Sequence, residues 1–315
     1  MAYVTGTANT IGEVTNAIIS ACTANGWTLT AADVISKGDA FMKLRTDAPG
    51  VKTGCRAGLG YASGALVSPC ALDCYVACPL SAEPFVFPMA YHIHIHGKEV
   101  YFFVNWSIDK WTSLCFGQSG IPGGPGKGVW IAGLGFTASA YSGGSFSWNG
   151  SGGSFASGCN QGNYAPADHT CGLGLFTQNP LAMTAGVSHG IYVHTGLPDW
   201  SDDSNVPMTG GSTRGLTFID NPSVNPTGQT VLVPIQPTID RGSSKRSIVL
   251  DLVYARYVRL DTLNVGDVIT FGSDRWKVYP VYKRDGSVRN GPSGFTGVTS
   301  RHSGTYGYAI LYDGP

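Results

Sequence analysis

Three histidines at alternate positions are the residues of this chain whose type and spacing most clearly permit chemistry. They lie in the stretch YHIHIHG and are His92, His94 and His96. Alternate side chains of a β-strand share one face, with direct neighbours about 6.5–7 Å apart. Two imidazoles at that separation can chelate one metal ion, whereas three are harder to bring together. The stretch therefore predicts either a metal site or the polar face of a strand that turns Ile93 and Ile95 inward.

A metal interpretation would also use an acidic residue. His92-x-His94 followed by Glu99 resembles part of the metal motif of the cupin enzymes, but the supporting glycines and a clear second motif are missing. His194 would add a ligand only by assumption. We therefore favour a strand face, half-solvated or covered by another subunit, and expect no metal and no cofactor. If that face lies between subunits, protonation near pH 6 should weaken assembly.

Four cysteines form a second set with possible metal-binding chemistry: Cys55, Cys70, Cys74 and Cys78. Zinc sites accept pairs separated by two to four residues, so the Cys-x3-Cys spacings are permissible. The usual second pair with matching spacing is absent. The alternative is one or two helical turns with cysteines as small buried side chains.

Other catalytic and binding motifs are weaker. The chain has no G-x-S-x-G nucleophile elbow, and GIPGGPGKG (120–128) lacks the Ser or Thr that follows the lysine of a phosphate-binding loop. The Asp-rich stretch 199–205 lacks the glycine and the glutamate of an EF-hand. Its aspartates, with aromatics such as Trp148 and Trp200, leave a glycan-binding module as an alternative. We predict that the protein is not an enzyme.

Composition narrows the choice of partners. Charged residues make up 13% of the chain and the net charge is zero, which gives no basic excess for binding nucleic acid. A surface with so few charges is expected to be covered in part by partners or by copies of the same chain. The N-terminus lacks a signal peptide and no apolar run reaches the length of a membrane helix, so we expect no membrane partner and folding in a cytoplasm with reduced cysteines.

The sequence predicts a mainly β protein, sandwich- or barrel-like, with a short N-terminal α-helix and an α+β description at the margin. Apolar positions recur at helical spacing over residues 11–25, Thr10 and Glu13 form a possible capping box, and Gly26 suits the end of the helix. A hairpin is expected over 91–107 with its turn at Gly97 and Lys98. Further β segments are expected at 40–46, 128–141, 190–196, 215–221, 230–240, 247–284 and 303–315.

Three stretches are expected to be loops, namely 47–84, 119–128 and the Gly/Ser-rich segment 142–171. Long loops inside a compact domain are usually binding loops or contact arms. Aromatic residues in the third loop would be poorly placed in water and are interface candidates. They are Phe146, Trp148, Phe155 and Tyr164. We divide the chain into a β-rich domain over 1–225 and a smaller barrel or sheet domain over 226–315.

Several blocks of the chain resemble the virion proteins of tailed bacteriophages. They are AIISACTANGWTL with the following SKGDAFMKLRT, the segment 90–118 with its Phe116-Gly117 pair, and GDVITFGSDRWKVYP with SGTYGYAILYD. The resemblance covers about half of the chain and implies a structural subunit of the particle, at the head-to-tail neck or in the tail. It brings no active-site residues.

This resemblance implies a homo-oligomeric ring, with six-fold symmetry as one option, that contacts other virion proteins and is assembled in the host cytoplasm. Large interfaces of this kind suit the low charge of the chain. A baseplate or tail-tip component is the alternative within the class. A metal-dependent cupin-like enzyme and a glycan-binding module are the alternatives outside it.

Overall fold

The computed structural model describes most of the N-terminal half of the chain and most of its C-terminal sheet. The described residues are 1–46, 53–70, 72–76, 85–120, 122, 124–137, 191–196, 200–201, 230–240, 246–260, 262–280 and 306–315. The Gly/Ser-rich segment 142–171, with its four interface candidates, and the expected strand at 215–221 lie outside these residues. So does the predicted domain boundary near residue 225, which stays a prediction.

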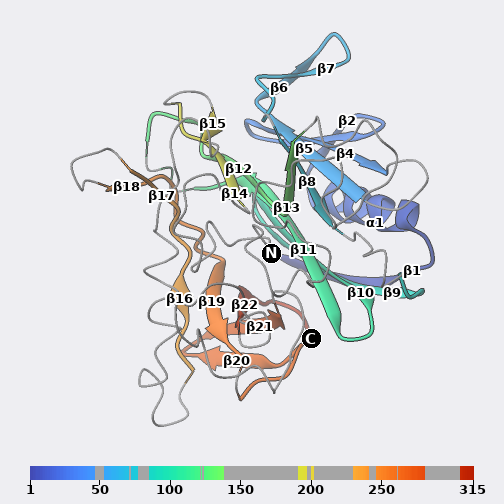
Figure 1. The fold of residues 1–315 in the computed structure, drawn as a ribbon, viewed down its shortest axis with the longest axis vertical. Coiled ribbons are helices and arrows are strands. Elements are labelled where there is room, and N and C mark those ends of the chain that lie inside the picture. Colours follow the sequence, from blue (N-terminus) through green and yellow to red (C-terminus); the bar gives the residue numbers. More distant parts are fainter. Residues whose placement is uncertain are drawn as a thin grey trace, which may run out of the picture.

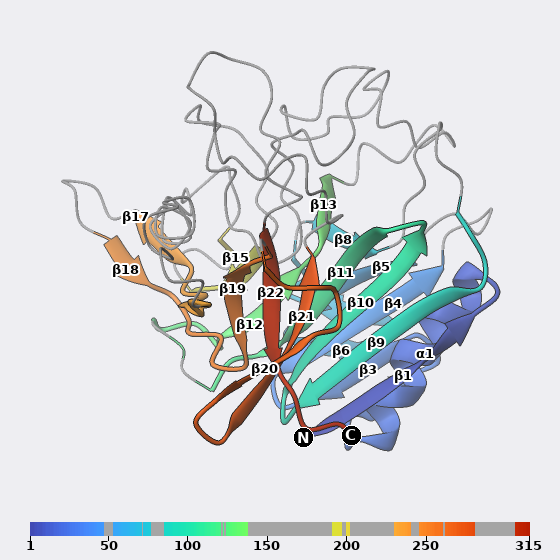
Figure 2. The same ribbon diagram turned by 90° about the horizontal axis from the view of Figure 1, so that it is seen from below.

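A seven-stranded antiparallel sheet crosses the middle of the molecule (Figures 1 and 2). In spatial order its strands are β1 (Ala2–Ala8), β9 (Met89–His96), β10 (Glu99–Ser107), β11 (Lys110–Gln118), β12 (Val129–Ala132), β14 (Ile191–His194) and β15 (Trp200–Ser201). The expected hairpin over 91–107 is confirmed as β9 and β10, whose turn is Gly97-Lys98. Gly97 has φ 59°, which glycine adopts without steric cost.

A six-stranded sheet packs on one face of this middle sheet. Its strands, in order, are β13 (Leu134–Thr137), β8 (Leu72–Val76), β5 (Thr53–Gly58), β4 (Ala40–Thr46), β3 (Val34–Lys37) and β2 (Thr28–Ala31). The core between the two sheets takes Met42 and Leu44 from β4, and Phe102 and Val104 from β10. A short hairpin of β6 (Gly60–Ala62) and β7 (Ala65–Val67) extends away from this layer (Figure 1).

The helix α1 (Ile11–Ala24) completes this core with its apolar stripe. The Thr10 hydroxyl accepts the N–H of Glu13, as the sequence predicts, while the Glu13 carboxylate accepts the N–H of Asn9. After Asn25, Gly26 takes φ 82° and the chain folds back, so that the N–H of Trp27 reaches the carbonyl of Cys22. The predicted helix, its Thr10 cap and its end at Gly26 are therefore confirmed, while the Glu13 carboxylate caps Asn9 instead of the Thr10 N–H that a capping box would use.

A five-stranded sheet from the end of the chain covers the opposite face of the middle sheet. Its order is β16 (Val233–Pro234), β19 (Ala255–Arg259), β22 (Tyr306–Leu311), β21 (Asp274–Pro280) and β20 (Val268–Phe271), and a separate hairpin pairs β17 (Thr238–Asp240) with β18 (Arg246–Ile248). Tyr101 and Phe103 of β10 enter the core on this side, together with Tyr279 and Tyr308. Because alternate residues of β10 enter two different cores, the middle sheet is buried on both faces.

These layers confirm a mainly β fold with one short helix in the part of the chain that is described. The expectation of a plain loop over 47–84 is wrong, because β5, β6, β7 and β8 all lie within it. The alternative of helical turns around Cys74 is wrong for the same reason, since β8 is a strand paired with β5 and β13. The small residues of this segment carry little β propensity, so pairing with neighbouring strands decides its structure.

Candidate functional site

The histidine face of β9 lies between the middle sheet and the C-terminal sheet. His94 and His96 are buried and His92 is half-buried. The rings that cover them belong to the same chain: Tyr279 contacts His92 and His94, and Tyr254 stacks on His96 with centroids 4.7 Å apart. The expectation of a half-solvated or subunit-covered face is therefore corrected, while the inward packing of Ile93 and Ile95 is confirmed.

Hydrogen bonds bind two of these imidazoles to tyrosines. Nε2 of His94 lies 2.8 Å from the hydroxyl of Tyr279, and Nδ1 of His92 lies 2.6 Å from the hydroxyl of Tyr3. The Tyr279 ring also stacks on Phe103 with centroids 4.1 Å apart and planes at 5°. The C-terminal sheet is thus joined to the middle sheet by both a hydrogen bond and an aromatic stack.

Burial keeps the histidines uncharged. Desolvation, with a smaller contribution from Lys277, lowers the pKa of His92 to about 4. Desolvation lowers the pKa of His96 to about 4, and that of His94 well below its usual value, with His96 and His92 adding to the effect. Neutral imidazoles inside an aromatic cluster provide packing and hydrogen bonds rather than charge.

Glu99, the acidic partner in the cupin-like interpretation, is also buried and lies opposite His96 in the hairpin register. Its carboxyl group accepts a hydrogen bond from the Tyr101 hydroxyl. Desolvation raises the pKa of Glu99 to about 8, so the group is mostly protonated at neutral pH. Among the residues placed in the structure, no group of three or more His, Cys, Asp or Glu side chains is arranged to hold a metal ion.

The cysteines of the second candidate set are likewise interior. Cys55, Cys70 and Cys74 are buried thiols that are not joined in disulfides, and Cys55 faces Cys74 across β5 and β8. Desolvation raises the pKa of the Cys55 and Cys74 thiols well above the usual value, which disfavours the thiolate that binds zinc. Cys78 lies outside the described residues.

His194 and Trp200 are placed in a different part of the molecule. Nδ1 of His194 accepts the N–H of Lys127, and the His194 ring contacts Trp200 edge-on. The indole N–H of Trp200 donates to the carbonyl of Ser68. Both side chains thus hold β14 and β15 against neighbouring loops.

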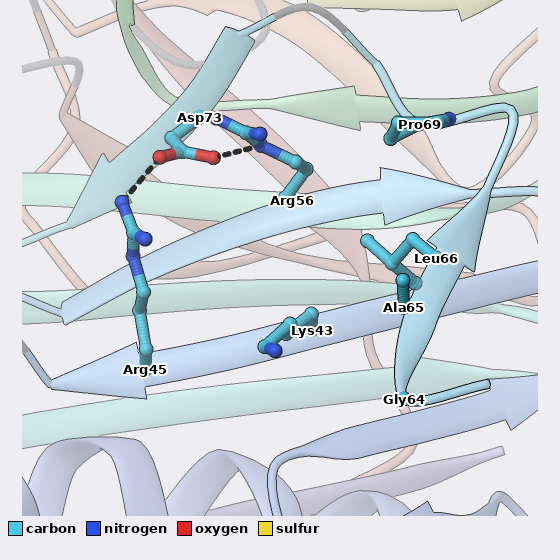
Figure 3. Close-up of a pocket in the computed structure, with 8 residues that line it drawn as sticks. All are labelled: Lys43, Arg45, Arg56, Gly64, Ala65, Leu66, Pro69 and Asp73. Carbon is cyan, nitrogen blue, oxygen red and sulfur yellow. Dashed lines mark hydrogen bonds and ion pairs between the residues drawn. The ribbon is translucent and has the colours of Figure 1, made fainter. Parts of the chain in front are cut away.

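A basic pocket that the sequence reasoning missed lies on the outer face of the six-stranded sheet (Figure 3). Its volume is about 280 Å³, and its lining residues are Lys43, Arg45, Arg56, Gly64, Ala65, Leu66, Pro69 and Asp73. The alternation in AFMKLRT could have indicated it, because Met42 and Leu44 enter the core and so turn Lys43 and Arg45 outward.

No helix in the described part of the chain is long and apolar enough to cross a membrane. Comparison with known proteins adds no family, since no protein-family model and no curated protein sequence matches this chain.

Proposed function

We propose that the protein is a structural subunit of a tailed-phage virion and forms a homo-oligomeric ring at the head-to-tail neck or in the tail. The resemblance of three sequence blocks to phage virion proteins supports the class. The observation that carries the assembly is the nature of the edge strands. Of the strands that the structure places, β1, β2 and β20 each lie at the end of a large sheet.

None of these three edges carries a charge or a proline. Their sequences are AYVTGTA, TLTA and VITF. Monomeric proteins usually protect an edge strand with lysine, proline or a covering segment, because its unpaired N–H and C=O groups would otherwise pair with another chain. β2 is partly protected by a register shift, but Leu29 is 51% exposed there.

The β20 edge exposes two apolar side chains to a neighbour. Val268 and Phe271 are 40% and 47% exposed at its two ends. Pairing between different edges of successive copies is a heterologous contact, which closes into a ring when the rotation permits. Backbone pairing would provide affinity and the exposed apolar side chains would provide specificity.

The proposal is tested by measuring the mass of the full chain in solution, with light scattering after size-exclusion chromatography. We expect a closed oligomer for the wild type and a lower mass for Phe271→Lys and Leu29→Lys. Ser273→Lys, a lysine placed in the turn after β20, is the matched control and should leave the mass unchanged. A wild type that stays monomeric at tens of micromolar would exclude the ring, and equal effects of Phe271→Lys and Ser273→Lys would exclude the edge contact.

A further inference from the structure

The basic pocket combines three cationic side chains with one carboxylate. Lys43 and Arg45 lie on β4, Arg56 on β5 and Asp73 on β8, while the β6–β7 hairpin and its flanks form the opposite wall (Figure 3). Formal charges in the lining therefore sum to about two positive. Lys43 also pairs with Asp33 at 3.5 Å, and both groups are partly exposed, so this pair is screened by water.

Asp73 holds both arginines in position. It is buried, and each of its oxygens accepts from one guanidinium, the first from Nε of Arg56 and the second from Nη2 of Arg45. A guanidinium carries five N–H donors, and the hydrogen bond to Asp73 uses the Nε donor of Arg56. The terminal nitrogens of Arg56 are thus held on a fixed side chain and can serve a further acceptor with little loss of entropy.

Lys43 adds a third positive charge to the pocket, next to the two arginines that pair with Asp73. It lies directly opposite Arg56 in the register of β4 and β5. Like charges that face each other across two strands destabilise a sheet. An anion bound between Lys43 and Arg56 would offset this repulsion.

We propose that this pocket is a docking site for a carboxylate side chain presented by an acidic segment of a partner protein. The charge of the lining selects an anion, and the fork of a guanidinium matches the two oxygens of a carboxylate. The walls formed by Ala65, Leu66 and Pro69 give the neighbouring residues of such a segment an apolar contact. This inference goes beyond the proposed ring, because it names a ligand chemistry and does not depend on the edge strands.

The test is titration of the full-length protein with a fluorescent, end-capped peptide of alternating glycine and glutamate, followed by anisotropy at low salt. We expect saturable binding that weakens about tenfold in Lys43→Gln and further in Lys43→Glu, because a charge-assisted contact is lost and then reversed. Lys43 is partly exposed and its ion pair with Asp33 is screened by water, so these variants should retain the wild-type unfolding temperature.

Lys127→Gln is the matched control, because Lys127 forms a comparable exposed pair with Asp39 at 3.8 Å on another part of the surface. It should bind the peptide as the wild type does. Equal affinity of Lys43→Gln and wild type would overturn the proposal, as would equal binding of a glycine–glutamine peptide. Inorganic phosphate is titrated in a separate experiment. Binding of phosphate without binding of the glutamate peptide would show a small-anion site and would also overturn the proposal.

Discussion

The hydroxyl of Tyr279, on the C-terminal sheet, lies 2.8 Å from Nε2 of His94, on the middle sheet. Residues 185 positions apart in the chain therefore share one buried hydrogen bond. The Tyr279 ring also stacks on Phe103, so this one side chain joins the two layers through a polar and an apolar contact.

Tyr279→Phe tests the polar part of that contact. The variant keeps the stack on Phe103 but leaves Nε2 of His94 without its hydroxyl partner, so we expect a loss of about 1–3 kcal/mol in the free energy of unfolding. Tyr279→Ala also removes the stack and should lose about 3–5 kcal/mol. Urea unfolding provides the measurement. Tyr61→Phe, on the β6–β7 hairpin, is the control and should change stability by less than about 0.5 kcal/mol.

The histidine face predicts a loss of stability in acid. Because the folded protein holds His92 and His96 at pKa values of about 4, below the ordinary 6.5, the unfolded chain takes up protons that the folded protein does not. The contribution of the neutral rings is complete above pH 6.5 and is lost as the pH falls from 6.5 through about 4. For buried His96 this amounts to about 3 kcal/mol.

Urea unfolding at intervals between pH 7 and pH 4 measures this loss, and His96→Gln should remove part of the slope. A free energy of unfolding that stays constant between pH 6.5 and pH 4 would contradict neutral burial of the ring. The structure also moves the expected pH response from near pH 6 to lower pH, and from assembly to the folding of a single chain.

Burial of Glu99 predicts that the free energy of unfolding depends on pH with the opposite sign. Its folded pKa of about 8 lies above the ordinary 4.5, so the folded protein keeps a proton that the unfolded chain releases. Its contribution to stability is complete below pH 4.5 and declines as the pH rises through 8. Glu99→Gln should remove this decline, so that the stability of the variant relative to wild type increases between pH 5 and pH 8. A relative stability independent of pH would show that Glu99 is ionised in the folded state.

A pair of isoleucines tests the assignment of buried and exposed positions. Ile93 is fully buried in the core between the middle sheet and α1, whereas Ile108 is 81% exposed at the β10–β11 turn. Ile93→Ala should lose about 2–5 kcal/mol of unfolding free energy and Ile108→Ala less than about 0.5 kcal/mol. Chemical denaturation of both variants checks this, and similar losses would contradict the placement of β9.

The local features of the fold were predictable from sequence because short-range physics determines them. Thr10 caps the N-terminus of α1 and Gly26 ends the helix at its C-terminus, while Gly97 fixes the turn of the β9–β10 hairpin. The partner of the histidine face was not predictable in this way. Alternation shows that His94 and Ile93 face opposite sides, but it does not show that a strand 185 residues later supplies Tyr279.

The same limit explains the missed pocket and the missed strands. Lys43 and Arg45 lie on one face by alternation, but Arg56 and Asp73 join them only through the pairing of β4, β5 and β8. Glycine, alanine and cysteine in β5 and β8 give a weak strand signal, and their positions inside a sheet depend on neighbours that are specified elsewhere in the chain.

The central claim is that the chain is a structural component of a phage particle. Its most direct test is quantitative mass spectrometry of particles purified by density gradient from a host that carries the encoding phage. We predict that the chain sediments with the particles at a fixed copy number equal to a small ring. Its absence from the particles, with the chain recovered only in the soluble lysate, would contradict the account.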